Sequence, residues 1–209
     1  MRVWAWSDGV ANFGDELGPI ILERLGHPVE RVDTIDQAEI LACGSLLEHA
    51  AREAAPGTIV WGSGLMHGDT ADLSHLDVRA VRGPLTARAA GLDPDIPVGD
   101  PAILVPGLWA KPHISRGLGV VRHYVDKREC PWADAVIDAD RPVDEVIEFI
   151  GSCRAVASSS LHGLIVARAW GIEVMRLPHP GVAGASFKWL DWLAGWHDAS
   201  PDELEVVLR

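Results

Sequence analysis

Short apolar segments alternate with helix-like segments along this 209-residue chain, and no other feature restricts its fold as strongly. Parallel strands need long crossover connections, and these are usually helices that cover both faces of the sheet. We therefore expect an α/β fold with parallel sheets. The predicted strands are at residues 2–6, 29–33, 40–44, 58–65, 77–82, 118–124, 135–138, 154–158 and 173–177.

Residues with known preferences for helix ends mark the segments between these strands. Asp15 suits the first turn of a helix that Gly26 ends. Ser45 suits the N-cap of the next helix. Further helices are predicted at 84–91, 143–153 and 161–171.

The strand–helix plan occurs twice, and a stretch without periodicity separates the two copies. Residues 107–117 mix proline, glycine and polar side chains, which is typical of a linker. We expect an N-terminal Rossmann-like lobe at 1–106, a linker at 107–117 and a C-terminal Rossmann-like lobe at 118–209.

Composition narrows the class of protein. A chain of 209 residues with 48% hydrophobic side chains can bury about 70% of the surface that it exposes when unfolded. Eighteen basic against 30 acidic residues give a formal charge of −12, which disfavours nucleic acid as a partner. The N-terminus lacks the apolar core of a signal peptide, and no run approaches the ~20 apolar residues of a membrane span. We expect a cytoplasmic protein without a transmembrane segment.

The three cysteines predict neither a disulfide framework nor a zinc site. They are far apart in the sequence and form no C-x-x-C pair, so buried thiols are the expected state. The cysteines are Cys43, Cys130 and Cys153.

Nine tryptophans are many for this length. Three of them follow one another at spacings of three and four and therefore share a helical face. We favour packing over sugar stacking for this stripe. It consists of Trp189, Trp192 and Trp196.

Several polar turns follow predicted strands, where doubly wound sheets bind ligands at helix N-termini. We expect turns from both halves to converge on one cleft. Familiar signatures do not explain them: His67 stands where G-x-G-x-x-G needs its third glycine, and Trp61 stands where a nucleophile elbow at Ser63 needs its first. The turns are at 12–15, 44–46, 62–68, 81–86 and 158–163.

Six segments, in order, resemble the motifs of polysaccharide pyruvyl transferases, and the likeness covers about residues 10–190. These segments are N-F-G-D-E-L (12–17), V-W-G-S-G (60–64), V-R-G-P-L-T (81–86), G-D-P-A-I-L (99–104), H-Y-V-D (123–126) and S-S-S-L-H-G-L-I-V-A (158–167).

The resemblance implies a compact version of the two-lobed, glycosyltransferase-B-like architecture. It also implies transfer of a pyruvyl group from phosphoenolpyruvate to a sugar, usually as a cyclic ketal. A histidine at the position of His162 is the general acid in that family, and basic residues hold the donor's carboxylate and phosphate. This chain departs from the pattern in two ways: Ser160 stands where many members have arginine, and the chain is shorter than most.

The residues themselves agree with a role for His162. Adding an alcohol to phosphoenolpyruvate requires an acid that protonates the methylene carbon, and an imidazole at a helix start suits this step. The alternative is a histidine that only bonds backbone at a turn. The adjacent serines can cap the helix or donate to phosphate oxygens, and they are Ser158, Ser159 and Ser160.

Cationic candidates for the anionic donor come from three segments. Arg82 can pair with a carboxylate or phosphate, although a surface salt bridge is an equal alternative. Arg122 and His123 end the first strand of the second half, and Arg122 would replace the charge missing at Ser160. Lys188 follows a glycine turn at the start of a helix.

The turn at 12–15 is predicted to meet the acceptor. Asp15 would orient a sugar hydroxyl or accept its proton, although an aspartate early in a helix is also ordinary. Asn12, Gly14 and Ser63 complete the predicted binding residues. No metal or cofactor is expected beyond phosphoenolpyruvate as donor substrate.

The sequence therefore predicts a phosphoenolpyruvate-dependent pyruvyl transferase that acts on a polysaccharide or a lipid-linked precursor. Two alternatives stay open: a glycosyltransferase that uses a nucleotide-sugar, and a catalytically silent saccharide-binding member of the family.

Overall fold

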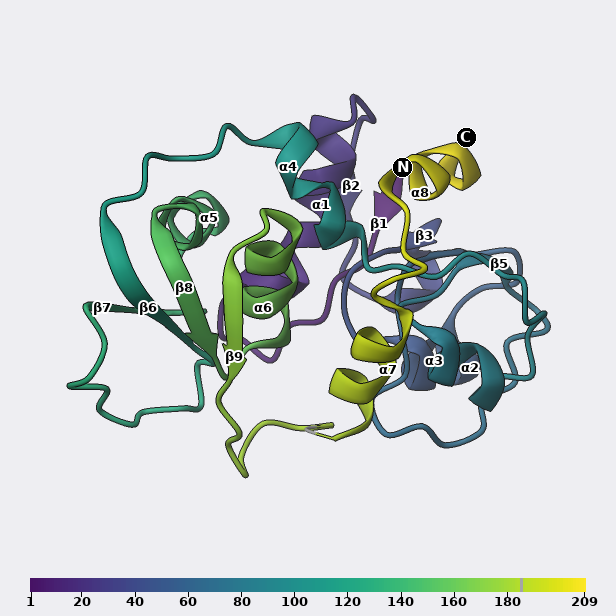
Figure 1. Cartoon of the computed structure of the whole chain (residues 1–209). Coiled ribbons are helices and arrows are strands. Elements are labelled where there is room, and N and C mark those ends of the chain that lie inside the picture. Colours follow the sequence, from purple (N-terminus) through teal and green to yellow (C-terminus); the bar gives the residue numbers. More distant parts are fainter. Residues whose placement is uncertain (185) are drawn as a thin grey trace. The chain divides into compact units, whose positions relative to one another are not determined.

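A computed structural model describes residues 1–184 and 186–209 of the chain (Figure 1). Its contacts divide the chain into two compact units. Unit 1 consists of Met1–Trp6, Gly18–Pro101 and Ser186–Arg209, and unit 2 of Ser7–Leu17 and Ala102–Ala185. The lobe and linker boundaries remain a prediction, with lobes at 1–106 and 118–209 and a linker at 107–117. The contacts group 7–17 with the second sheet and 186–209 with the first.

Unit 1 contains a five-stranded, all-parallel sheet with the order β2-β1-β3-β4-β5. This is the flavodoxin-like order, in which the chain reverses direction across the sheet between the first and third strands. The strands are β1 (Arg2–Val3), β2 (Glu30–Arg31), β3 (Ile40–Leu41), β4 (Ile59–Trp61) and β5 (Asp77–Ala80).

The helices of unit 1 come from both ends of the chain. The division between the units passes through α1 (Phe13–Arg24), and a 3-10 turn, η1 (Ile35–Gln37), precedes β3. The C-terminal helix α8 joins this unit through the Trp61 indole N–H, which donates to the Leu204 carbonyl at 2.8 Å. The other helices are α2 (Leu47–Glu53), α3 (Pro84–Ala89), α7 (Phe187–Gly195) and α8 (Pro201–Leu208).

Unit 2 contains a four-stranded, all-parallel sheet with the order β7-β6-β8-β9. Counted within the unit, this order is 2-1-3-4, so the chain again reverses direction beside its first strand. The strands are β6 (Arg116–Arg122), β7 (Ala135–Asp138), β8 (Cys153–Ser158) and β9 (Glu173–Arg176).

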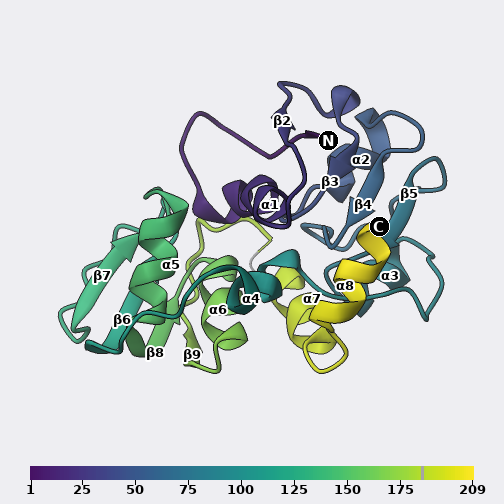
Figure 2. The same ribbon diagram turned by 90° about the horizontal axis from the view of Figure 1, so that it is seen from above.

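The two faces of the unit 2 sheet are covered differently. Helices α5 (Val143–Gly151) and α6 (Leu161–Ala169) lie on the same side of the sheet (Figure 2), as right-handed crossovers that move in one direction require. On the other face, Cys130 of the irregular 123–134 segment packs against Val120 and Ala157. No helix connects β6 to β7, so this loop carries the H-Y-V-D motif over the sheet.

The predicted α/β class with two parallel sheets is confirmed, and the predicted elements occur in the predicted order. Several boundaries are wrong: the strands predicted at 2–6 and 58–65 are shorter in the structure. Ser45 also does not cap α2, which begins at Leu47; its hydroxyl instead accepts a hydrogen bond from Arg82. After a 3-10 turn, η2 (Pro101–Leu104), helix α4 (Val105–Leu108) reaches into the predicted linker.

The predicted burial of the cysteines and packing of the tryptophan stripe are confirmed. All three cysteines are buried thiols. Trp189 and Trp192 are buried on α7, and the Trp192 ring lies 5.7 Å from that of Trp196. In residues 1–184 and 186–209, no helix combines the length and apolar character needed to cross a membrane.

Candidate functional site

The carboxyl ends of β6 and β8 lie side by side at the point where the strand order of the unit 2 sheet reverses. Doubly wound sheets bind ligands outside such ends, because loops diverge there and leave a crevice. The residues directly after the two strands are linked: the His123 backbone N–H donates to the Ser159 hydroxyl at 3.0 Å. This places five predicted site residues in one neighbourhood, namely Arg122, His123, Ser158, Ser159 and Ser160.

Ser158 has a structural role at this edge. Its hydroxyl lies 2.7 Å from the Val121 carbonyl and 2.8 Å from the Ser160 carbonyl, and it accepts the Ser160 N–H at 2.9 Å. Gly163 lets α6 approach closely, because a Cβ there would overlap the Ser158 hydroxyl. These bonds tie β8 to β6 and set the entry into α6, so Ser158 has little capacity left for a ligand.

Ser160 occupies the N-cap position of α6, but within the described residues its side chain makes no capping hydrogen bond. It is buried at 3% exposure. A cap without a side-chain bond leaves N–H donors in the first helical turn available to an anion.

His162 is the second residue of α6, is 9% exposed, and lies against the first turn of α1. A Cβ at Gly14 would overlap the imidazole at Nδ1, so only glycine allows this approach. The Phe13 ring meets the imidazole edge-on, with 6.4 Å between ring centroids. The N-F-G-D and S-S-S-L-H-G motifs, far apart in the sequence, therefore meet within unit 2.

The start of α1 is held in this place by bonds at both its backbone and its side chains. The Phe13 N–H donates to the Ala139 carbonyl, just after β7, at 2.7 Å. The Asn12 side chain accepts the Gly14 N–H at 3.2 Å and donates to the Asp15 carboxylate at 2.6 Å. Asn12 therefore acts as a capping residue that also orients Asp15.

Arg122 lies at the same edge, but its guanidinium is largely occupied. Nε and Nη2 donate to the two oxygens of Asp138 at 2.7 and 3.1 Å, and Nη1 donates to the Arg128 carbonyl at 2.8 Å. The hydrogen bond to Asp138 raises the pKa of Arg122. Among the described residues, these bonds use three of the five N–H donors that a guanidinium has. Two remain for an anion.

Asp126, the last residue of H-Y-V-D, organises the loop after β6. Its side chain is fully buried, and the Arg128 backbone N–H and Nε donate to Oδ1 at 3.1 and 2.9 Å. Burial by itself raises the pKa of Asp126, but hydrogen bonds from Arg128 and Ser159 outweigh it and lower the pKa. His179 Nε2 lies 3.8 Å from the same carboxylate. Asp126 therefore positions Ser159 as an ionised acceptor.

Tyr124 connects this loop to the segment before α1. Its hydroxyl donates to Asp8 at 2.6 Å, and its ring lies 4.4 Å from the His123 ring. The Asp8 hydrogen bond raises the pKa of Tyr124 to about 12 and lowers that of Asp8. The two loops beside the predicted site are thus joined through side chains.

In unit 1, Arg82 forms a buried ion pair. Nε donates to Asp191 on α7 at 3.0 Å, while Nη1 and Nη2 donate to the Ser45 hydroxyl at 2.7 Å and the Leu65 carbonyl at 2.6 Å. Asp191 also accepts from the Thr86 N–H and hydroxyl at 2.8 and 2.7 Å. The Arg82 and Asp191 side chains are 1% and 0% exposed. Arg82 therefore holds α7 to the turn after β5.

Ser63 and Lys188 also lie in unit 1. The Ser63 hydroxyl donates to the Gly44 carbonyl at 2.9 Å and accepts the Leu46 N–H at 3.3 Å, which ties the turns after β3 and β4 together. Lys188 is buried in the first turn of α7. Ala185, in the turn before Lys188, lies outside the described residues.

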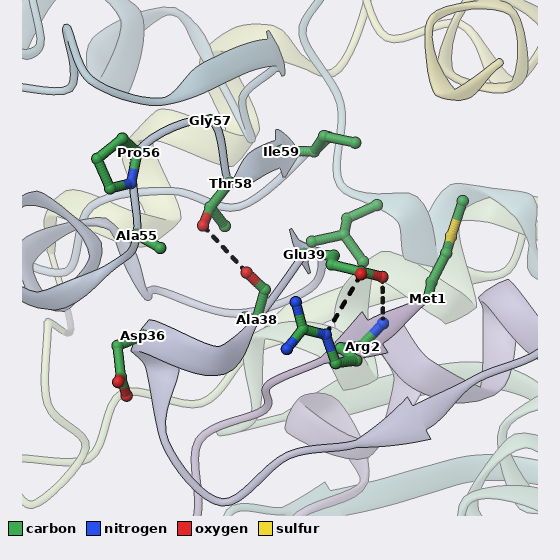
Figure 3. Close-up of a pocket in the computed structure, with 11 residues that line it drawn as sticks. Met1, Arg2, Asp36, Ala38, Glu39, Ala55, Pro56, Gly57, Thr58 and Ile59 are labelled. Carbon is green, nitrogen blue, oxygen red and sulfur yellow. Dashed lines mark hydrogen bonds and ion pairs between the residues drawn. The ribbon is translucent and has the colours of Figure 1, made fainter.

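A hollow of about 400 Å³ lies at the other edge of unit 1, where its strands begin (Figure 3). The Thr58 hydroxyl donates to the Ala38 carbonyl at 3.1 Å in its wall, and Arg2 Nε donates to Glu39 at 3.3 Å. No predicted site residue lines it. It faces the amino ends of the strands, where this fold class does not usually bind ligands.

Sequence reasoning missed the partners that hold the predicted residues. Asp126 carried a signal, since it belongs to a quoted motif. Asp138, Arg128 and Asp191 carried none, because a carboxylate or guanidinium on a surface-like segment looks the same whether it is solvated or paired.

The comparisons with known proteins can be set against this geometry. A sequence profile described as polysaccharide pyruvyl transferase matches residues 12–179. The chain is 32% identical over 208 residues to the succinoglycan biosynthesis protein ExoV of Rhizobium meliloti, covering 92% of this chain and 64% of ExoV. It is 29% identical over 201 residues to the uncharacterized protein L143 of Acanthamoeba polyphaga mimivirus, covering 88% of this chain and 70% of L143. The chain thus spans 64% of the length of the first relative.

A solved structure of an uncharacterized protein from Klebsiella pneumoniae has a similar fold. The TM-score is 0.53 at 14% identity, and the match covers 91% of this chain and 86% of that one. The family profile begins at the capping residue of α1 and ends at His179, so it contains every motif residue of the unit 2 edge. By sequence and by the order of its motifs, the chain belongs to the polysaccharide pyruvyl transferase family.

Proposed function

We propose that this chain transfers a pyruvyl group from phosphoenolpyruvate to a sugar of a surface polysaccharide or of its precursor, forming a ketal. Family membership supports pyruvyl transfer. The name of the Rhizobium meliloti relative, a succinoglycan biosynthesis protein, supports a saccharide acceptor. Two parts of the proposal go beyond family membership: that phosphoenolpyruvate is the donor, and that the product is a ketal.

One observation carries it: the imidazole of His162 lies against the first turn of α1, beside the carboxyl ends of β6 and β8. Gly14 lets the ring come this close to the backbone of α1. The surroundings offer helix N–H donors, a carboxylate at Asp15 and a cation at Arg122. An acid, an anion-binding edge and an acceptor for a hydroxyl proton are what the reaction requires.

The chemistry uses these groups as follows. His162 donates a proton to the methylene carbon of phosphoenolpyruvate, which becomes the methyl group, and C2 becomes electrophilic. A sugar hydroxyl bonds to C2 and loses its proton, for which Asp15 is the proposed acceptor. The C2–O bond to the phosphate then breaks, and inorganic phosphate leaves with the proton that Asp15 holds. A second hydroxyl bonds to C2 and gives its proton to the imidazole of His162, which closes the ketal and restores the acid. No oxidant or reductant is consumed.

The predicted cations differ in their capacity for the donor. Arg122 keeps 22% of its side chain exposed and has two N–H donors left after its internal bonds. Arg82 is almost completely buried, and each of its three nitrogens already has a protein acceptor. We therefore assign binding of phosphoenolpyruvate to Arg122 in preference to Arg82 or Lys188. Arg122→Ala should weaken binding of phosphoenolpyruvate.

Ligand-dependent stabilisation tests the proposal. A ligand that binds only the folded state raises the melting temperature. Phosphoenolpyruvate should raise it, whereas a panel of nucleotide-sugars should not, and phosphate should be released once an acceptor saccharide is added. Stabilisation by a nucleotide-sugar alone would favour a glycosyltransferase. Stabilisation by saccharide without any phosphate release would favour a silent binding protein.

A further inference from the structure

Three aromatic rings form a cluster in unit 1, separate from every residue assigned above. The centroids of the Trp6 and His49 rings are 4.9 Å apart, with an interplanar angle of 32°. The Trp6 and Trp4 rings meet edge-on, with 6.2 Å between their centroids. Trp4 and His49 are 6.4 Å apart. Trp4 packs on the hydrophobic core of unit 1, so the cluster rests on the fold.

Trp6 remains open to solvent although two rings hold it. In residues 1–184 and 186–209 two tryptophans are strongly exposed, Trp6 at 40% and Trp132 at 49%. Single exposed apolar residues need no explanation, but an exposed indole fixed by two neighbours is a rigid surface. Stacking a ligand on such a ring costs the protein little side-chain entropy, because the ring is already ordered.

The place of the cluster is also where this sheet would bind a ligand. Trp4 and Trp6 directly follow β1, and His49 lies on α2, which follows β3. Strands β1 and β3 are neighbours, and the chain reverses direction across the sheet between them. In the flavodoxin-like order, ligands bind outside the carboxyl ends of these two strands.

His49 supplies a directed polar group beside the indole. Its Nδ1 lies 3.3 Å from Nη2 of Arg52, whose side chain is 59% exposed. A guanidinium can only donate, so Nδ1 is the acceptor and the imidazole proton sits on Nε2. His49 Nε2–H is therefore a donor beside the Trp6 indole, and Arg52, which contacts His49, adds further N–H groups to the cluster.

We propose that Trp6, with His49 and Arg52, forms a saccharide subsite that stacks one pyranose ring of the acceptor on the indole. An apolar ring face flanked by donors matches a pyranose, which has C–H groups on its faces and hydroxyls around its rim. The choice of a saccharide over another stacking ligand rests on the proposed function. The subsite itself lies wholly within unit 1.

Saturation-transfer NMR with methyl β-glucopyranoside and methyl β-galactopyranoside tests this subsite without phosphoenolpyruvate. Trp6→Ala should weaken binding about tenfold, the effect of one aromatic contact, and Trp6→Phe should restore part of it. Trp132→Ala is the matched control, because it removes the other exposed tryptophan, from unit 2, and should leave binding unchanged. Circular dichroism and thermal melts check that each variant is folded.

The outcomes separate the subsite from the catalytic proposal. Binding that is lost in Trp6→Ala but kept in Trp132→Ala and in His162→Gln supports the subsite, even if no phosphate is ever released. Binding that survives Trp6→Ala, or wild-type protein that binds neither glycoside, overturns it. Trp6-dependent binding of uridine in place of the glycosides also overturns it, since the ring would then stack a planar base.

Discussion

The imidazole of His162 and the backbone of Gly14 are in such close contact that no side chain fits between them. Gly14→Ala should therefore displace the imidazole, even though alanine is the better helix former. We expect phosphate release from phosphoenolpyruvate to fall about 10- to 100-fold, since a small misplacement of a catalytic group has effects of this size. Overpacking should lower the free energy of unfolding by about 1–3 kcal/mol.

Gly107 is the matched control for this substitution. It also lies in a helix of unit 2, but a Cβ there would meet no atom within 4 Å. Gly107→Ala should leave activity unchanged and stability equal or slightly higher. Wild-type phosphate release by Gly14→Ala would show that the contact has no part in catalysis.

Asp126→Asn tests the buried carboxylate behind Ser159. Because hydrogen bonds lower its pKa in the folded state, Asp126 stabilises the fold above its ordinary pKa of 3.8, and this stability is lost as the pH falls through the lower folded value. Urea unfolding from about pH 7 to about pH 3 should show wild type more stable at the upper end and the difference shrinking towards the lower end. A difference that is constant with pH would contradict an ionised Asp126.

The Arg82–Asp191 pair should matter more for stability than for donor binding. Removing one partner leaves a buried, uncompensated charge, so Arg82→Met and Asp191→Leu should each cost about 3–5 kcal/mol of unfolding free energy. The double variant should cost much less than the sum, which a double-mutant cycle in urea measures. Additive effects, or a single variant that loses donor affinity at unchanged stability, would instead favour the anion-binding role.

Tyr124 offers a spectroscopic check of the link between the two loops of unit 2. It is the one tyrosine among 209 residues, so ultraviolet absorbance during alkaline titration reports it alone. The Asp8 hydrogen bond should hold the pKa of Tyr124 at about 12. Asp8→Asn should return it towards the ordinary 10.0. A wild-type titration midpoint near the ordinary value would mean that the bond is not formed in solution.

Local patterns in the sequence predicted much of this structure. Strand and helix order follow from short apolar segments and helix-end signals. The motif order led to the prediction that His162 and the N-F-G-D turn are site residues, and the structure brings Gly14 and His162 into contact. Both predictions depend on residues close together in the chain, where periodicity and capping preferences act directly.

Pairings between distant residues could not be predicted from one sequence. Arg82 and Asp191 are 109 positions apart, and nothing near either residue reveals the other. Ser158 looked like a ligand donor, yet its hydroxyl bonds the neighbouring backbone, as serines at strand ends often do. The return of 186–209 to the first sheet likewise depends on buried contacts of α7 and α8.

Proton delivery by His162 is the central claim, and product formation in deuterated water measures it most directly. With phosphoenolpyruvate and an accepted saccharide, wild type should release phosphate and form a ketal methyl group that carries one deuteron. His162→Gln should slow both about 10²- to 10⁴-fold, the usual contribution of general acid catalysis. His113→Gln, which alters an exposed histidine of the same unit, should behave as wild type. Wild-type rates of phosphate release and deuterium incorporation in folded His162→Gln would contradict the account.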